Sequence, residues 1–171
     1  SILLFPTDTK GFAVSKKLEK IGNHASDTAE LFFEDCRIPQ RYLLGEEGKG
    51  FYYLMQNFQS ERLIGATSTL AGARRALDRS AAYGKERKAF GKPIMAREVW
   101  KHTFADLYTK AEAAKSLCYE TVADFNEERY VKGTEISMET VKKIAMCKLF
   151  VCDVANAIMD TCLQFHGGMG Y

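Results

Sequence analysis

The sequence predicts a mainly α-helical protein, an antiparallel helical bundle preceded by a few strands of a truncated β domain. The prediction rests on a change in the spacing of apolar residues. Up to about Leu44 they alternate with polar residues, as in strands, and after Gly50 they recur every three or four positions, as in helices. The change divides the chain of 171 residues into residues 1–45 and residues 46–171.

The first part contains three candidate strands separated by turn-forming residues. They cover residues 2–5, the stretch around Phe12 and Val14, and residues 29–33. Strands this short and this few make a poor independent sheet, because their edges leave backbone groups unpaired. We therefore expect residues 1–45 to be the tail of a larger β domain that begins before Ser1.

The second part contains three predicted helices of roughly 25 to 35 residues each, judged by their period. One follows Gly50, one follows Pro93, and one begins near Ser137, a residue type that caps helices well. Helices of this length suit an antiparallel bundle with short connections. The third is apolar on nearly every face from Ile144 to Leu163, which predicts a central place in the bundle or in an oligomer interface.

Composition excludes several classes of protein. Lys and Arg number 24 against 22 Asp and Glu, a near balance that argues against nucleic-acid binding. No apolar run approaches the roughly 20 residues that a membrane span needs, so we expect no membrane insertion. The five cysteines show no CxxC spacing and the three histidines lie far apart, which predicts reduced core thiols and no metal site.

Glu61 is a candidate general base. It follows Phe58 by three positions and Leu54 by seven, so a helix places all three on one stripe. Burial among apolar groups would raise the pKa of this carboxyl, which suits proton abstraction. The alternative is that the first turns of the helix project beyond the core and leave Glu61 solvated.

Two further segments are suited to contact a phosphate-bearing ligand. Residues 87–93 join the first two helices and contain three cations beside Phe90. They form either an anion-binding connection or a solvated turn with Phe90 in the core. Residues 164–171 place three glycines after a helix, which indicates a helix stop or a backbone that a flat ligand can approach.

These segments together resemble the acyl-CoA dehydrogenase family over nearly the whole chain. Residues 87–93 resemble its R-x-x-F-G-x-P pattern, and residues 164–171 its Q-x-x-G-G-x-G-Y pattern. Residues 27–39 resemble the last strands of its middle β-barrel domain, and residues 44–51 the entry into its C-terminal helical domain. The resemblance implies that residues 1–45 end that barrel and that residues 46–171 form the helical domain without its last helix.

The resemblance also implies a flavin adenine dinucleotide (FAD) site shared between subunits. Arg87 would contact the FAD pyrophosphate of a neighbouring subunit, and Phe90 would pack near the adenine end. Gln164, Gly167 and Gly168 would line the cofactor across a dimer interface. Sites of this kind imply an obligate oligomer, and the family's usual form is a homotetramer built as a dimer of dimers.

Other positions correspond to the acyl-CoA site of the family. Phe58, Gln59 and Arg62 would contact the substrate. Glu61 matches the position of the catalytic base in the isovaleryl-CoA and long-chain branches, whereas most other branches hold the base in a segment beyond Tyr171.

Two positions depart from the family pattern. Glu98 stands where relatives commonly carry a glutamine that touches the flavin's adenosine half, and a carboxylate near a pyrophosphate would repel it. Ala89 replaces a hydroxyl residue found in some relatives.

The reaction that the resemblance implies is α,β-dehydrogenation of an acyl-CoA to a trans-2-enoyl-CoA, in fatty-acid or branched-chain oxidation. FAD would be the cofactor and an electron-transfer flavoprotein the electron acceptor. The alternatives are an acyl-CoA oxidase or flavin monooxygenase on the same scaffold, or an isolated, non-catalytic helical oligomerisation module. The expected location is a bacterial cytoplasm or the mitochondrial matrix.

Overall fold

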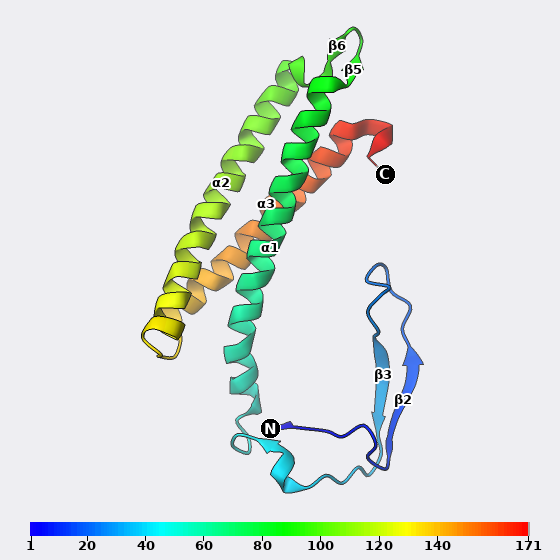
Figure 1. Ribbon diagram of the computed structural model, residues 1–171, viewed down its shortest axis with the longest axis vertical. Coiled ribbons are helices and arrows are strands. Elements are labelled where there is room, and N and C mark those ends of the chain that lie inside the picture. The colour runs from blue at the N-terminus through cyan, green and yellow to red at the C-terminus, as the bar shows by residue number, and fades with distance from the viewer. Residues whose placement is uncertain (171) are drawn as a thin grey trace. The chain divides into compact units, whose positions relative to one another are not determined.

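The computed structural model describes residues 1–170 and confirms the predicted fold class (Figure 1). The chain forms two compact units, one from Ser1 to Met55 and one from Gln56 onward. The division falls inside the first long helix, whereas the change of period in the sequence lies about ten residues earlier. The assignment of residues 1–45 to a separate domain therefore stays a prediction.

The N-terminal unit contains the predicted strands, paired as two small antiparallel ladders. Strand β1 (Ile2–Leu3) pairs with β4 (Leu43–Leu44), and β2 (Phe12–Lys17) pairs with β3 (Ala29–Phe33). A single turn of 3-10 helix, η1 (Gln40–Tyr42), precedes β4. Each ladder has two strands, so both of its outer edges stay unpaired within the described residues.

One face of the β2–β3 ladder holds a small aromatic cluster. The ring centroids of Phe5, Phe12 and Phe33 lie 4.9 to 5.3 Å apart in tilted and edge-to-face contacts. The neighbouring side chains Leu31 and Phe32 are exposed. The larger β domain that would cover this apolar surface stays a prediction.

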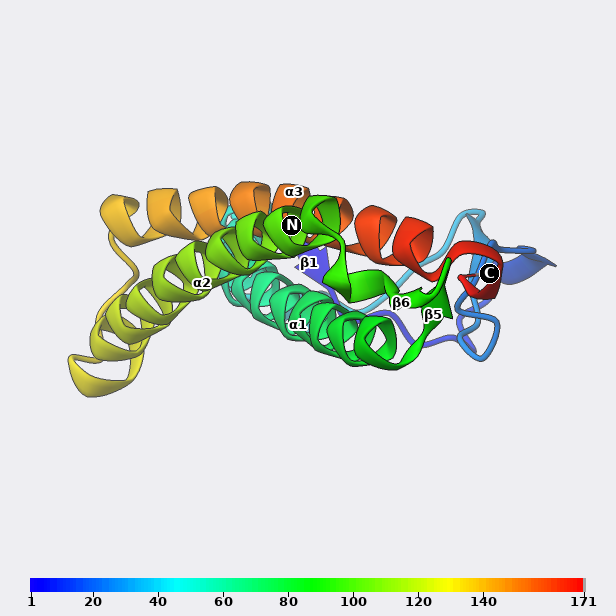
Figure 2. The same cartoon turned by 90° about the horizontal axis from the view of Figure 1, so that it is seen from above.

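The second unit is a bundle of three helices, as predicted. They are α1 (Gly50–Glu86), α2 (Glu98–Asn126) and α3 (Met138–His166), with α2 antiparallel to the other two (Figures 1 and 2). Ser137 is the N-cap of α3, and its Oγ accepts a hydrogen bond from the backbone N–H of Thr140 at 3.2 Å.

Short elements connect the helices. A hairpin of β5 (Lys88–Ala89) and β6 (Lys92–Pro93) and the 3-10 turn η2 (Ile94–Ala96) join α1 to α2. The π-helical turn η3 (Glu127–Val131) extends α2, and the 3-10 turn η4 (Gly167–Met169) follows α3.

The core lies where the three helices face one another. The apolar residues that α1 buries there are Leu63, Ala66, Leu70, Ala73 and Leu77. Those of α2 are Phe104, Leu107, Ala111, Ala114, Cys118, Thr121 and Phe125, and those of α3 include Ile144, Cys147, Val151, Val154, Ile158, Cys162 and Phe165. Leu54, which the sequence places on one stripe with Phe58, is exposed, and so is Phe51, which precedes it by three positions at the same helical spacing.

Helix α3 keeps apolar side chains on its outer face as well. Met146, Leu149, Met159 and Leu163 are exposed in this chain, whereas the apolar residues on the inward face of the same helix are buried. The pattern agrees with the sequence, and the partner for the outer face stays a prediction.

The cysteines are free thiols, and Cys118, Cys147 and Cys162 are buried as predicted, while Cys36 and Cys152 are half-buried. Burial raises the pKa of Cys118 to about 11. Residues 1–170 contain no cluster of three or more metal-ligating side chains. None of the helices described is sufficiently long and apolar to cross a bilayer.

Candidate functional site

The hairpin that follows α1 displays an aromatic side chain. Its two turn residues, Phe90 and Gly91, have φ values of 53° and 80°, the left-handed pair of a type I′ turn. A bulky non-glycine residue rarely adopts this conformation. The side chain of Phe90 is 96% exposed, so the alternative that placed it in the core is wrong.

Hydrogen bonds tie the hairpin to the end of α1. The backbone N–H of Arg87 donates to the carbonyl of Tyr83 at 2.9 Å, and the Arg87 carbonyl accepts from Ile94 N–H at 2.9 Å. The side chain of Arg97 lies over the Phe90 ring, with its guanidinium carbon 5.3 Å from the centroid, and its Nη2 donates to the Ala89 carbonyl at 3.2 Å. The exposed Arg87 side chain therefore stands on a fixed backbone.

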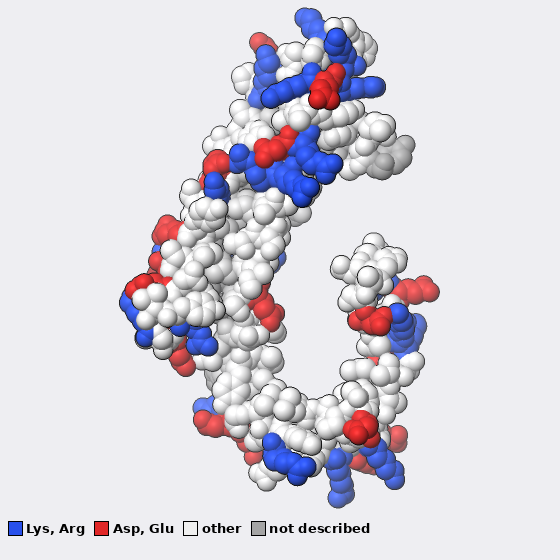
Figure 3. All heavy atoms as spheres, in the orientation of Figure 1, with Lys and Arg blue, Asp and Glu red and all other residues white. Residues whose placement is uncertain are grey.

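This end of the bundle carries positive charge. Between positions 85 and 101 the chain has six Lys and Arg residues and two glutamates. Figure 3 shows Lys and Arg side chains gathered where Figure 1 shows β5 and β6. Such a surface attracts phosphate groups.

The second candidate segment is the turn after α3. Gln164 is exposed on the last turn of the helix, and the N–H of Gly167 donates to its carbonyl. Gly167 has φ 58° and ψ −135°, a conformation that requires glycine. At Gly168 an added Cβ would meet no atom within 4 Å, so neither the backbone conformation nor packing within the described chain demands glycine there. Tyr171, the last residue of this motif, lies outside the described residues.

The fold brings these two segments to the same end of the bundle. The rings of Tyr83 on α1 and His166 on α3 are stacked, with centroids 4.4 Å apart and an interplanar angle of 19°. One residue further along α1, a Cβ on Gly84 would lie 2.3 Å from Cζ of Phe165. The last turns of α1 and α3 are therefore in direct contact, and only glycine fits at position 84.

The candidate substrate segment lies near the other end of α1. Glu61 and Arg62 are exposed, Phe58 is half-buried, and Gln59 is 8% exposed on the inward face. Asn57 Nδ2 donates to Glu61 Oε1 at 2.7 Å, which orients the carboxylate.

The prediction that Glu61 shares a buried apolar stripe is wrong within this chain. The buried face of α1 contains Gln59 and Leu63. Leu54 and Glu61 point to a different face of the same helix, which is exposed. Its role as base stays a prediction.

Glu98 occupies the first turn of α2, which explains its charge structurally. A carboxylate at this position interacts favourably with the N-terminal end of the helix dipole. Its position at a flavin contact stays a prediction.

Three residues with a structural link to the candidate site were not assigned from the sequence. Arg97 contacts Phe90, and Tyr83 and His166 connect the two candidate cofactor segments. No local pattern identifies a contact between residues 83 positions apart in the chain, although the positive charge of Arg97 beside three other cations was a usable signal.

Comparison with known proteins identifies relatives over the whole chain. A family model described as "Acyl-CoA dehydrogenase, C-terminal domain" matches residues 48–171. The mitochondrial long-chain specific acyl-CoA dehydrogenase of Sus scrofa is 37% identical over 171 residues, which is 100% of this chain and 38% of that protein. An acyl-CoA dehydrogenase of Bacillus subtilis (strain 168) is 36% identical over 171 residues, which is 100% of this chain and 43% of that protein.

Solved structures agree with this result. The acyl-CoA dehydrogenase of Geobacillus kaustophilus is 37% identical, with a TM-score of 0.84 over 99% of this chain and 42% of that chain. The chain thus spans about two fifths of the length of the relatives that it matches. The motifs, the fold and these matches agree, and the chain belongs to the acyl-CoA dehydrogenase family.

Proposed function

We propose that this chain is part of a flavin-dependent acyl-CoA dehydrogenase that converts an acyl-CoA thioester to its trans-2-enoyl-CoA. Enzymes of the family are FAD-dependent oxidoreductases. The observation that carries the proposal is the pairing of the Arg87–Phe90 segment with the glycine turn at one end of the bundle. In this proposal residues 1–45 end a β-barrel domain and residues 46–171 form most of the helical domain.

The residues at this end fit a flavin dinucleotide. Arg87 supplies a permanent cation with forked donors, suited to a pyrophosphate. The exposed ring of Phe90 offers a flat apolar surface to an adenine, and the bare backbone at Gly167 and Gly168 admits a ligand at van der Waals distance. Gln164 adds an exposed amide beside that backbone.

The length of α1 supports a site shared between subunits. Glu61 and Arg87 are 26 residues apart, which corresponds to about 39 Å along a helix. The substrate segment and Arg87 thus stand near opposite ends of one long helix. We therefore propose a homo-oligomer, a dimer of dimers, in which each site takes residues from two subunits.

In this function Glu61 removes a proton from the α carbon of the acyl group. Asn57 holds the carboxylate by a hydrogen bond, and Phe58, Gln59 and Arg62 contact the acyl-CoA around it. The bound flavin supplies a hydride acceptor for the β carbon.

The proposed electron acceptor is an electron-transfer flavoprotein. An acyl-CoA oxidase or a flavin monooxygenase on the same scaffold would pass electrons to dioxygen instead. Oxygen consumption during turnover distinguishes these functions. The relatives include mitochondrial and bacterial enzymes, so we propose the mitochondrial matrix or a bacterial cytoplasm as the location.

The test is anaerobic reduction of the flavin in the full-length protein by a panel of straight and branched acyl-CoAs. The wild type bleaches with at least one substrate, and Glu61→Gln slows bleaching by roughly 100-fold or more, the range of general base catalysis. Glu139→Gln, at an exposed glutamate of α3, is the matched control and bleaches like the wild type.

Equal rates for the wild type and Glu61→Gln would place the base beyond Tyr171. If no acyl-CoA bleaches the wild type, the proposed reaction is wrong.

A further inference from the structure

The contact between Tyr83 and His166 links the two segments assigned to the flavin. Tyr83 lies four residues before Arg87, and its carbonyl accepts the Arg87 backbone N–H at 2.9 Å. His166 directly precedes Gly167. The stacked rings, 4.4 Å apart, therefore join the backbone that carries Arg87 to the backbone of the glycine turn.

The orientation of the His166 ring is set by a second contact. Its Nδ1 lies 2.8 Å from the carbonyl oxygen of Cys162. Because a carbonyl oxygen only accepts, Nδ1 carries the proton and donates. The ring is held at one edge by α3 itself and on one face by Tyr83.

The packing beneath the stack leaves little room for adjustment. The ring of Phe165 is buried, with Trp100 and Phe104 each 4.8 Å away in edge-to-face contacts. Gly84, the neighbour of Tyr83, lies directly against Phe165. Helices α1 and α3 are thus in close contact at this level, and the half-buried Tyr83–His166 pair lies beside the Gly84–Phe165 contact.

We propose that Tyr83 and His166 are positioning residues for the flavin, because their stack sets the separation between Arg87 and the Gly167–Gly168 backbone. The proposal rests on the proposed function, which puts both segments on one dinucleotide. A ligand held at two points binds tightly only when the two points are already at the right separation. Loss of the stack removes one of the two contacts between the end of α1 and the end of α3, the Gly84–Phe165 contact being the other, and weakens binding without removing any group that touches the ligand.

The experiment measures FAD affinity in the full-length protein after removal of its flavin. Tyr83→Leu and His166→Leu are compared with the double variant and with Tyr83→Phe, which keeps the stacked ring. Tyr130→Leu is the control, because Tyr130 forms an aromatic contact with Phe125 at the far end of the bundle. The melting temperature of each flavin-free variant is recorded beside its FAD dissociation constant.

We expect each leucine variant to bind FAD about fivefold more weakly, within the range that one aromatic pair contributes. The double variant has the same FAD dissociation constant as the single variant that binds FAD less tightly, because both substitutions remove the same contact. Tyr83→Phe and Tyr130→Leu bind like the wild type.

Three results would overturn the inference. They are unchanged FAD affinity in both leucine variants, losses that multiply in the double variant, and losses that follow the melting temperature in every variant, Tyr130→Leu included. A wild type that binds no FAD would overturn the proposed function itself and is recognised before any variant is compared.

Discussion

The two ends of the helical bundle are closed by different forces. At the end that carries the hairpin and the glycine turn, aromatic rings meet: Phe165 packs against Trp100 and Phe104, and Tyr83 stacks on His166. This contact depends on the fit of the rings and on burial of apolar surface.

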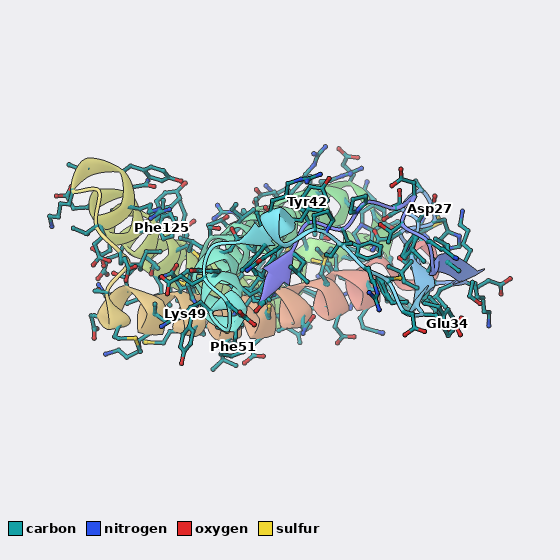
Figure 4. The ribbon with its side chains drawn as sticks, turned by 90° about the horizontal axis from the view of Figure 1, so that it is seen from below. Asp27, Glu34, Tyr42, Lys49, Phe51 and Phe125 are labelled. Carbon is teal, nitrogen blue, oxygen red and sulfur yellow. The ribbon has the colours of Figure 1, made fainter. Side chains whose placement is uncertain are left out.

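At the opposite end, where α2 is followed by α3, hydrogen bonds to charged groups add to a small buried apolar cluster. A carboxylate oxygen of Glu128 accepts from the Ser137 backbone N–H at 2.7 Å, and the other accepts from the hydroxyls of Ser137 and Thr140 at 2.8 and 2.9 Å. Gln56 of α1 donates to Glu135 in the same connection at 3.2 Å. Phe125, labelled in Figure 4, is the aromatic residue where α2 ends.

The difference separates an end packed mainly through aromatic rings from an end with many hydrogen bonds. The segments assigned to the flavin stand on the aromatic end, where their separation is fixed inside one chain. The segment assigned to the acyl-CoA begins close to the end where α2 is followed by α3. Glu61 is exposed there, and within the described residues its side chain accepts a hydrogen bond from Asn57. A fixed scaffold suits the cofactor, and an open segment suits a substrate that enters and leaves.

The largest effect is expected from removing the centre of the aromatic end. Phe165→Ala lowers the free energy of unfolding by about 3 to 5 kcal/mol, because Phe165 is 5% exposed and its removal leaves a cavity. Ile64 lies on the outer face of α1 and is 63% exposed, so Ile64→Ala lowers the free energy of unfolding by less than about 1 kcal/mol. Urea unfolding of both variants measures the difference, and equal losses would contradict the assigned core.

Next in size is the loss of the cation on the hairpin. Arg87→Gln weakens FAD binding roughly 10- to 100-fold, the range of a hydrogen bond to a charged group. Lys85→Gln, which removes a neighbouring exposed cation, is the matched control and changes affinity little. Fluorescence titration of the flavin-free protein gives both constants, and similar losses in the two variants would indicate general charge attraction instead of a specific contact.

A smaller effect, and one that depends on pH, is expected at the polar end. Hydrogen bonds from the backbone and side chain of Ser137 lower the pKa of Glu128 below its ordinary value of 4.5. Because the folded pKa is the lower one, Glu128 contributes its full stabilisation above the ordinary value, and the contribution is lost as the pH falls through the folded value.

Glu128→Gln therefore lowers stability at neutral pH and makes the loss of stability on acidification less steep. Denaturant titrations between pH 7 and pH 3 check both effects. Phe165→Ala serves as the comparison, since its loss stays constant over that range. A Glu128→Gln protein whose stability falls with pH as steeply as the wild type would contradict the assignment.

The smallest effect is expected at Glu98. Glu98→Gln removes a charge from the first turn of α2 and costs about 0.3 to 1 kcal/mol of stability. If Glu98 also lies near the pyrophosphate, the same variant binds FAD more tightly, since a repulsion disappears. Thermal unfolding and FAD titration of one preparation measure both quantities, and unchanged affinity would separate Glu98 from the cofactor site.

Much of the fold was predictable because it depends on local periodicity. The apolar residues of α2 and α3 recur at helical spacing over many turns, and Ser137 caps α3 as its residue type suggests. The prediction of a buried stripe in the first turns of α1 was wrong for a physical reason. Phe51 and Leu54 continue a helical stripe in the sequence, but the partners that bury α1 begin only at Gln59 and Leu63.

The candidate site divides in the same way. The residues that bear its chemistry, among them Arg87, Phe90 and Glu61, were identified from residue type, spacing and family resemblance. Their surroundings were not. Burial of a carboxylate or exposure of a ring depends on neighbours that are distant in the chain, so the exposed states of Glu61 and Phe90 appear only in three dimensions.

Helix period, caps, turn residues and the motifs of the family are local properties, and the order of residues along the chain was enough to determine them. The pairing of α1 with α3 was decided by tertiary packing, because Gly84 and Tyr83 meet Phe165 and His166 across more than 80 positions of chain. No local preference encodes such a contact. It forms because the stacked and buried rings lose more water-exposed apolar surface together than either helix can lose alone.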